Sequence, residues 1–168
     1  MKLSISNGNA GKFVLVFLLL LSLTPVFGQA EVKIKRTRAE YLENDQFYRI
    51  SEFFTYRENT GGDLIVRTQD EDRSGYYFTI RLTSYPYQKE VVEEAVRLQV
   101  ILPGDIEPTL FTFPLGPAKR KNPLLLIGLT GDDWPDPEAR PLAWHLSFHD
   151  EKGTQLAEAQ SFLWSIED

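Results

Sequence analysis

Apolar and polar residues alternate with a period of two along most of the chain, which is typical of β-strands. In the clearest run, Tyr76–Leu82, the even-numbered residues are apolar, which predicts that they face the core and that Tyr77 faces outward. Similar runs occupy residues 64–67, 96–102, 109–115, 142–149 and, less regularly, 156–164. The unbroken apolar run Leu124–Leu129 is typical of a strand buried on both faces. Short strands at this spacing predict an all-β sandwich or barrel.

Turn-forming residues separate these runs. Segments rich in glycine, proline and asparagine lie at 59–63, 73–75, 103–105 and 116–117. Asp150–Gly153 is predicted to be a hairpin loop in which Gly153 supplies a positive φ. The hairpin from Trp144 to Phe162 resembles the closing strand pair of immunoglobulin-like sandwiches. We therefore expect an antiparallel β-sandwich of about eight strands with an immunoglobulin-like architecture.

Three segments fit the strand pattern less well. Within residues 39–56, Tyr48, Ile50 and Phe54 suggest a strand, whereas Glu40–Phe47 allows a short helix. The segment Glu90–Ala95 allows an initial helical turn. Val32 and Ile34 alternate with lysines, which favours a first edge strand. The expected organisation is a signal peptide at 1–30, an N-terminal segment at 31–46 that is an edge strand or partly flexible, and a single sandwich domain at 47–168.

The first 30 residues have the order of a secretory signal peptide. Lys2 and Lys12 come before the apolar run Phe13–Leu23, and no acidic residue lies among the first 30. A spanning helix needs about 20 apolar residues, so an uncleaved membrane anchor is the less favoured alternative. Small residues predict cleavage after Ala30, with Gly28 as the second choice. We expect export to the periplasm or the exterior of a cell, with no stable membrane span after cleavage.

The net charge and the residue composition limit the classes of partner that we expect. Without residues 1–30, which hold two lysines and no acid, the chain has 16 basic and 24 acidic residues, a net charge of about −8. Nucleic acid is therefore not expected as a partner, because phosphate binding needs clustered Lys and Arg. The chain has no cysteine and no Asn-x-Ser/Thr sequence, which fits a bacterial exported protein. No cofactor is expected.

Three aromatic residues are candidates for ligand binding. Tyr85 and Tyr87 follow a predicted strand, and Trp134 lies in a predicted loop. Exposed aromatic rings stack on sugars and on protein partners, because they offer apolar area with a polar edge. Trp144 and Trp164 are expected to pack inside.

Acidic residues in a loop allow a second candidate site. Asp132, Asp133 and Asp136 offer carboxylate oxygens to calcium, although their spacing matches no EF-hand. His145 and His149 are not expected to share a metal, because four residues of strand separate them by about 13 Å.

No catalytic motif is present, and we do not expect an enzyme. The chain lacks the serine, zinc and phosphate-binding motifs that mark common hydrolases and transferases. The preferred interpretation is a non-catalytic exported protein that binds another envelope or extracellular protein through a sheet edge or face. The first alternative is a carbohydrate-binding module that uses the loop aromatics to hold polysaccharide. The second is a hydrolase or calcium-dependent domain with carboxylates in its loops.

Overall fold

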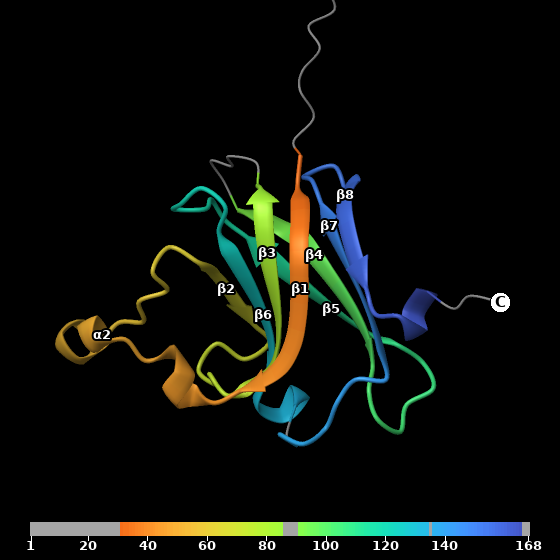
Figure 1. Ribbon diagram of the computed structural model, residues 1–168, viewed down its shortest axis with the longest axis horizontal. Helices are drawn as coiled ribbons and strands as arrows, with labels where there is room; N and C mark the ends of the chain where they lie inside the picture. The colour runs from red at the N-terminus through yellow and green to blue at the C-terminus, as the bar shows by residue number, and fades with distance from the viewer. Residues whose placement is uncertain (1–30, 86–90, 135, 166–168) are drawn as a thin grey trace, which may run out of the picture.

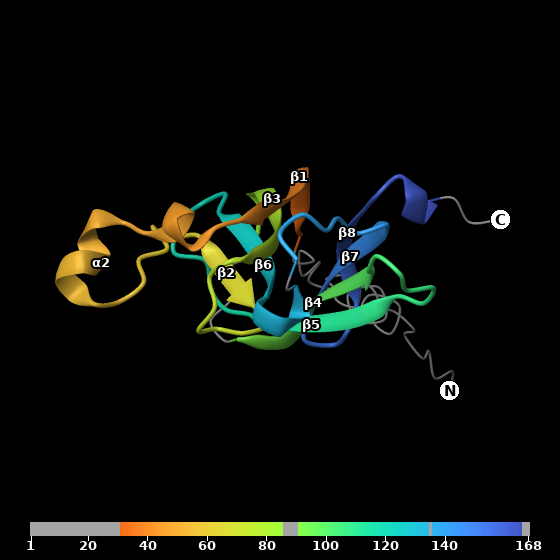
Figure 2. The ribbon, with the colours of Figure 1, turned by 90° about the horizontal axis from the view of Figure 1, so that it is seen from below.

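Two four-stranded sheets pack face to face in the computed structural model, which describes residues 31–85, 91–134 and 136–165 (Figures 1 and 2). The strands are β1 (Lys33–Leu42), β2 (Leu64–Arg67), β3 (Gly75–Ser84), β4 (Val92–Ile101), β5 (Thr109–Leu115), β6 (Leu124–Thr130), β7 (Ala143–His149) and β8 (Gln155–Gln160). One sheet has the order β1-β3-β6-β2 and the other β5-β4-β7-β8. Helical elements are short: η1 (Asn44–Phe47), α2 (Ile50–Thr55), η2 (Gly131–Asp133) and η3 (Leu163–Ser165).

The inner faces of the sheets form one hydrophobic core. On β3, Phe78, Ile80 and Leu82 are fully buried, as the alternation along this strand predicts. They belong to one cluster with Leu125, Ile127 and Leu129 of β6 in the same sheet and with Val96, Leu98, Val100, Leu146 and Phe148 of the opposite sheet. Because each strand contributes alternate side chains to this layer, the sandwich is held together by packing alone in a chain without cysteine.

The strand predictions are largely confirmed. Each predicted run contains a strand, but the last run, 156–164, is strand only as far as Gln160 and is followed by η3. The hairpin loop at Asp150–Gly153 is present, and Gly153 has a φ of +78°. The edge strand expected around Ile34 is β1, which pairs only with β3 among the described strands. The pairing is antiparallel throughout except between β2 and β6, which are parallel.

Two local expectations are corrected. The segment before Ala95 is not helical where it is described, because β4 begins at Val92. Within 39–56, the expected short helix is present only at its end, as η1, because β1 continues to Leu42. The strand suggested by Tyr48, Ile50 and Phe54 is wrong, since Ile50 and Phe54 belong to α2. No helix in the described part of the chain is long and apolar enough to cross a membrane.

Candidate functional site

Between β1 and β2 the chain leaves the sandwich and forms a projection, residues 43–63, that contains η1 and α2. Both ribbon views show α2 standing away from the two sheets at one side of the molecule (Figures 1 and 2). The projection is fixed where it begins and ends. The backbone N–H of Asn44 donates to the Ser74 hydroxyl at 3.0 Å, and Asp63 accepts from the backbone N–H of Leu124 at 2.8 Å and from Arg120.

The projection exposes large apolar side chains. The most exposed are Tyr48 (62 %), Ile50 (86 %), Phe53 (79 %), Phe54 (74 %) and Tyr56 (92 %), together called the apolar tip. In α2 the spacing of Ile50, Phe53 and Phe54 places them on one side of the helix, as i, i+3 and i+4. Contiguous exposed apolar surface of this kind marks interaction sites on soluble proteins.

The end of α2 fixes the position of Tyr56. This residue has a left-handed backbone conformation with φ +53°, and its N–H donates to the Glu52 carbonyl at 2.8 Å. A tyrosine seldom adopts this conformation, and backbone strain concentrates at functional sites. The conformation ends the helix and leaves the Tyr56 side chain almost fully in solvent.

A buried arginine anchors the projection to β2. Arg67, whose side chain is 5 % exposed, donates through both terminal nitrogens to Glu58, at 2.6 and 2.9 Å. Its Nε donates to the hydroxyl of Tyr77 at 2.7 Å, and its guanidinium lies 5.1 Å from the centre of the Phe47 ring. This two-bonded pair connects residue 58 of the projection to the sheet.

A second ion pair, between Glu52 of α2 and Arg73, connects the helix to the segment before β3. Glu52 accepts from Arg73 at 2.8 Å through one carboxylate oxygen and from the backbone N–H of Asn59 at 3.0 Å through the other. Arg73 also lies over the Tyr48 ring, 4.9 Å from its centre. The hydroxyl of Tyr77 donates to the Arg73 carbonyl at 2.8 Å, so the two ion pairs share one tyrosine.

The expectation that Tyr77 faces outward into solvent is wrong. It lies on the outer face of its sheet, as the alternation predicts, but it is fully buried because the projection covers it. Its ring contacts that of Phe47 with 4.9 Å between centres. It also lies against Gly128, where an added Cβ would meet the ring at 2.5 Å. The glycine therefore makes room for the tyrosine that joins both anchors.

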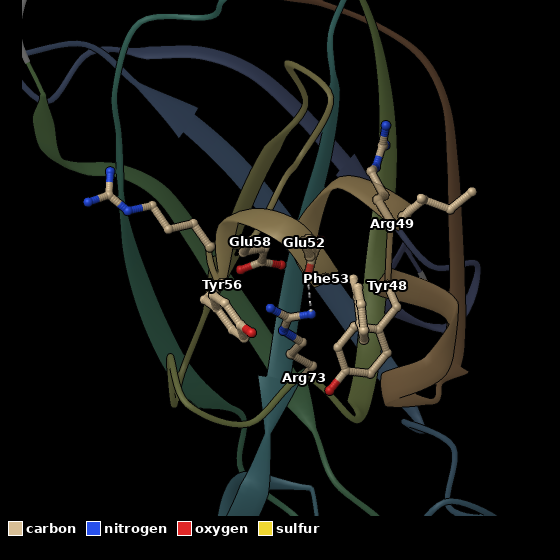
Figure 3. A pocket seen from close by; sticks show the side chains of 9 residues that line it. Tyr48, Arg49, Glu52, Phe53, Tyr56, Glu58 and Arg73 are labelled. Carbon is tan, nitrogen blue, oxygen red and sulfur yellow. Dashed lines mark hydrogen bonds and ion pairs between the residues drawn. The ribbon is translucent and has the colours of Figure 1, made fainter.

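A hollow of about 580 Å³ opens on one side of the projection (Figure 3). Aromatic rings of Tyr48, Phe53 and Tyr56 line it, and the Glu52–Arg73 pair lies between them. Arg49, Ile50, Arg57 and Glu58 complete the lining. Apolar walls with a few polar groups at the centre are the usual composition of a binding pocket.

The carboxylates of both anchors have lowered pKa values. The backbone N–H of Asn59 and then Arg73 lower the pKa of Glu52, and the hydrogen bonds from Arg67 lower the pKa of Glu58, both below the ordinary value of 4.5. A carboxylate with a lowered folded-state pKa stabilises the fold above its unfolded pKa, and this stabilisation is lost as pH falls through the folded value.

We therefore expect amide hydrogen exchange in residues 43–63 to rise as pH falls below about 4.5, the ordinary pKa of both carboxylates. The strand β4 serves as the internal control, since neither anchor contacts it. After correction for intrinsic exchange, equal behaviour of the two segments between pH 7 and pH 3 would contradict this account of the anchors.

Trp134 is not the exposed loop aromatic that the sequence suggested. Its side chain is 4 % exposed and belongs to the core, where it stacks on Tyr76 with 4.6 Å between ring centres. Tyr85 is partly buried against the core and donates to the Gly116 carbonyl at 3.1 Å, and burial raises its pKa to about 12. Tyr87 lies outside the described residues. Of the two candidates that the structure describes, neither Tyr85 nor Trp134 is an exposed aromatic residue.

The acidic loop gives no metal centre within the described residues. Asp132, Asp133 and Asp136 do not form a group that could hold an ion, and Asp136 accepts from the backbone N–H of Glu138 at 2.9 Å. His145 and His149 lie on β7, as expected, with separate partners. The first contacts Glu158 at 3.2 Å, and the second contacts Ser147 at 2.8 Å.

Sequence reasoning missed the projection as a site. The usable signal was the i, i+3, i+4 spacing of Ile50, Phe53 and Phe54, which places three large apolar residues on one helix face without a second helix to cover them. Compared with known proteins, the chain matches no family model, and no curated protein and no solved structure is significantly similar to it.

Proposed function

We propose that this protein is a non-catalytic, exported binding protein that engages another envelope or extracellular protein through the apolar tip. The observation that carries the proposal is the set of five large apolar side chains, each 62–92 % exposed, on a projection that two ion pairs hold in place. Covering these side chains with a partner would be favourable, because burial of apolar area contributes about 25 cal/mol per Å².

The shape and composition of the tip favour a protein partner. The hollow beside α2 is a concave surface that suits a protruding side chain better than the flat surface of a bilayer. Tyrosine, phenylalanine and arginine are enriched at the centres of protein interfaces. The net charge of about −8 in residues 31–168 also opposes approach to an anionic membrane. These features support a contact on the projection rather than on a sheet edge.

The strand order supports an immunoglobulin-like frame for this binding protein. With strands named in immunoglobulin order, β1, β3 and β6 take the places of A, B and E, and β5, β4, β7 and β8 take those of C′, C, F and G. In this frame β2 lies where strand D is found, but it is parallel to β6 and comes between A and B along the chain. The projection and β2 are then an insertion, and insertions on a rigid frame often carry function.

Export is the second part of the proposal. The charged start, the short apolar run and the small residues near Ala30 support a cleaved signal peptide, which delivers the domain to the periplasm or the cell exterior. A chain without cysteine needs no oxidising compartment to fold. The partner is accordingly expected in the envelope or outside the cell.

Capture from the native envelope tests the proposal. The protein, tagged after Asp168 and produced at native level in its own host, is crosslinked lightly and recovered as wild type and as the double variant Phe53→Ser/Phe54→Ser. We expect one protein to be recovered in stoichiometric amount with the wild type and at least tenfold less with the variant. Both substitutions replace exposed residues and should leave the unfolding temperature unchanged.

A matched control and three contrary outcomes complete the design. The variant Ile106→Ser removes an equally exposed apolar side chain outside the projection and should retain the partner. Equal recovery with all three proteins would contradict the assignment of the surface. Binding of the wild type, but not the variant, to anionic phospholipid vesicles would identify a membrane surface instead of a protein. A dimer formed by the purified wild type alone would identify a second copy of this chain.

A further inference from the structure

We propose that the hollow beside α2 receives a segment of the partner in which a carboxylate stands next to a large apolar side chain. This inference rests on the proposed function and adds the chemistry of the partner. Its basis is Arg73 at the centre of the hollow, Arg57 at its border with no side-chain partner among the described residues, and the aromatic side chains of the lining.

Arg73 is the central group. Its side chain is 19 % exposed, and one of its five N–H donors binds Glu52. Its other N–H groups have no acceptor among the described residues, although the guanidinium lines the hollow. Figure 3 shows it in the middle of the hollow, with Tyr48 on one side and Tyr56 on the other. A guanidinium with unused donors in an apolar surrounding binds a carboxylate strongly, because a charge-assisted hydrogen bond is stronger there than in water.

The charge balance of the hollow also favours an anion. Both acidic groups of the lining are already neutralised, Glu52 by Arg73 and Glu58 by Arg67. Arg49 donates to the carbonyl of Thr60 at 3.3 Å and retains its positive charge. Arg57 makes no ion pair and no side-chain hydrogen bond within the described residues, so an excess of positive charge surrounds an apolar hollow in an acidic chain.

The aromatic lining of the hollow indicates the second part of the ligand, a large apolar side chain. Three aromatic side chains, Tyr48, Phe53 and Tyr56, offer surfaces on which a phenylalanine, tyrosine or leucine of the partner would be covered. The carboxylate beside this side chain can come from a neighbouring Asp or Glu or from the partner's C-terminus. Both sources present the same group to Arg73 and Arg57, and peptides that carry only one of the two carboxylates distinguish the sources.

Three short peptides serve as probes in a titration followed by ¹⁵N chemical shifts of the purified protein. The first, acetyl-Ser-Glu-Phe-Ser-amide, has a side-chain carboxylate, and the second, acetyl-Ser-Gln-Phe with a free C-terminus, has a terminal one. The third, acetyl-Ser-Gln-Phe-Ser-amide, has none. We expect at least one acidic peptide to bind about tenfold more tightly than the neutral one, with shifts in residues 43–63 and 73. The peptide that binds identifies the source of the carboxylate.

Arginine variants test whether Arg57 and Arg73 cause the preference for acidic peptides. Arg57 is exposed, so Arg57→Gln should fold normally and bind the preferred acidic peptide about fivefold more weakly, while its affinity for the neutral peptide stays the same. Arg73→Lys retains the charge but not the planar donors and should also weaken binding. Arg97→Gln removes an arginine on β4 and is the matched control.

The outcomes separate this inference from the proposed function. Equal affinity for acidic and neutral peptides, no effect of Arg57→Gln and Arg73→Lys, or no binding of any peptide at 5 mM would overturn the carboxylate assignment. Capture of a partner that depends on Phe53 and Phe54 would in that case still support the apolar tip. Loss of that dependence, with acidic peptide binding intact, would overturn the proposed function and leave the chemistry of the hollow in place.

Discussion

Replacing Trp134 with alanine should lower the free energy of unfolding by about 3–5 kcal/mol, the usual cost of truncating a buried aromatic ring. The ring is 4 % exposed, belongs to the main hydrophobic cluster and stacks on Tyr76. Its removal leaves a cavity at the end of the core that the loop after η2 can fill only in part. Denaturant unfolding of Trp134→Ala measures the loss.

Two further variants distinguish a core role from a ligand-binding one. Trp134→Phe retains an aromatic ring and removes an indole N–H that has no partner among the described residues, so its loss should be clearly smaller. Phe162→Ala truncates an aromatic residue that is 80 % exposed and should change stability by less than about 0.5 kcal/mol. A cost below about 1 kcal/mol for Trp134→Ala would show that the ring is not packed as described.

Replacing Glu58 with alanine is the second change with a large expected effect, about 2–4 kcal/mol of unfolding free energy. It leaves the guanidinium of Arg67, whose side chain is 5 % exposed, without its counter-charge. Because the Glu58 side chain is 27 % exposed, water can approach the site, and the effect should fall below the full cost of a buried unpaired charge. Denaturant unfolding and proteolysis of residues 43–63 are the measurements.

A double replacement tests whether the unpaired charge is the cause. Glu58→Leu with Arg67→Met removes both charges and retains apolar volume, and it should recover most of the stability that Glu58→Ala loses. Tyr77→Phe, which removes only the shared hydroxyl, should cost about 1–2 kcal/mol. A double variant as unstable as Glu58→Ala would show that the loss comes from packing and not from the charge.

The alternation of apolar residues was sufficient to predict the strands, because each strand contributes one face to a single core. The prediction for Phe78, Ile80 and Leu82 needed only the period of two and was confirmed. The parallel pairing of β2 with β6 could not be predicted, since 56 residues and three other strands separate Arg67 from Leu124 and no local sequence pattern indicates their contact.

Side-chain burial in the loops was predicted less well, for physical reasons that differ between residues. Trp134 follows two aspartates and precedes a proline, which are turn residues, yet the turn directs its ring into the core. Tyr77 lies on the outer face as predicted, but the projection covers that face. Glu52 is buried because Arg73, 21 residues later, supplies its counter-charge, and such long-range pairs leave no sequence signal.

The most direct test of the central claim, that the apolar tip is the contact surface, is site-specific photocrosslinking in the native envelope. The photoreactive residue p-benzoyl-phenylalanine is placed at Phe54, in the tip, or at Leu110, an exposed position on the edge strand β5. We expect one crosslinked protein from position 54 and none from position 110. Crosslinking from position 110 with none from position 54 would contradict the account and move the contact to the sheet edge.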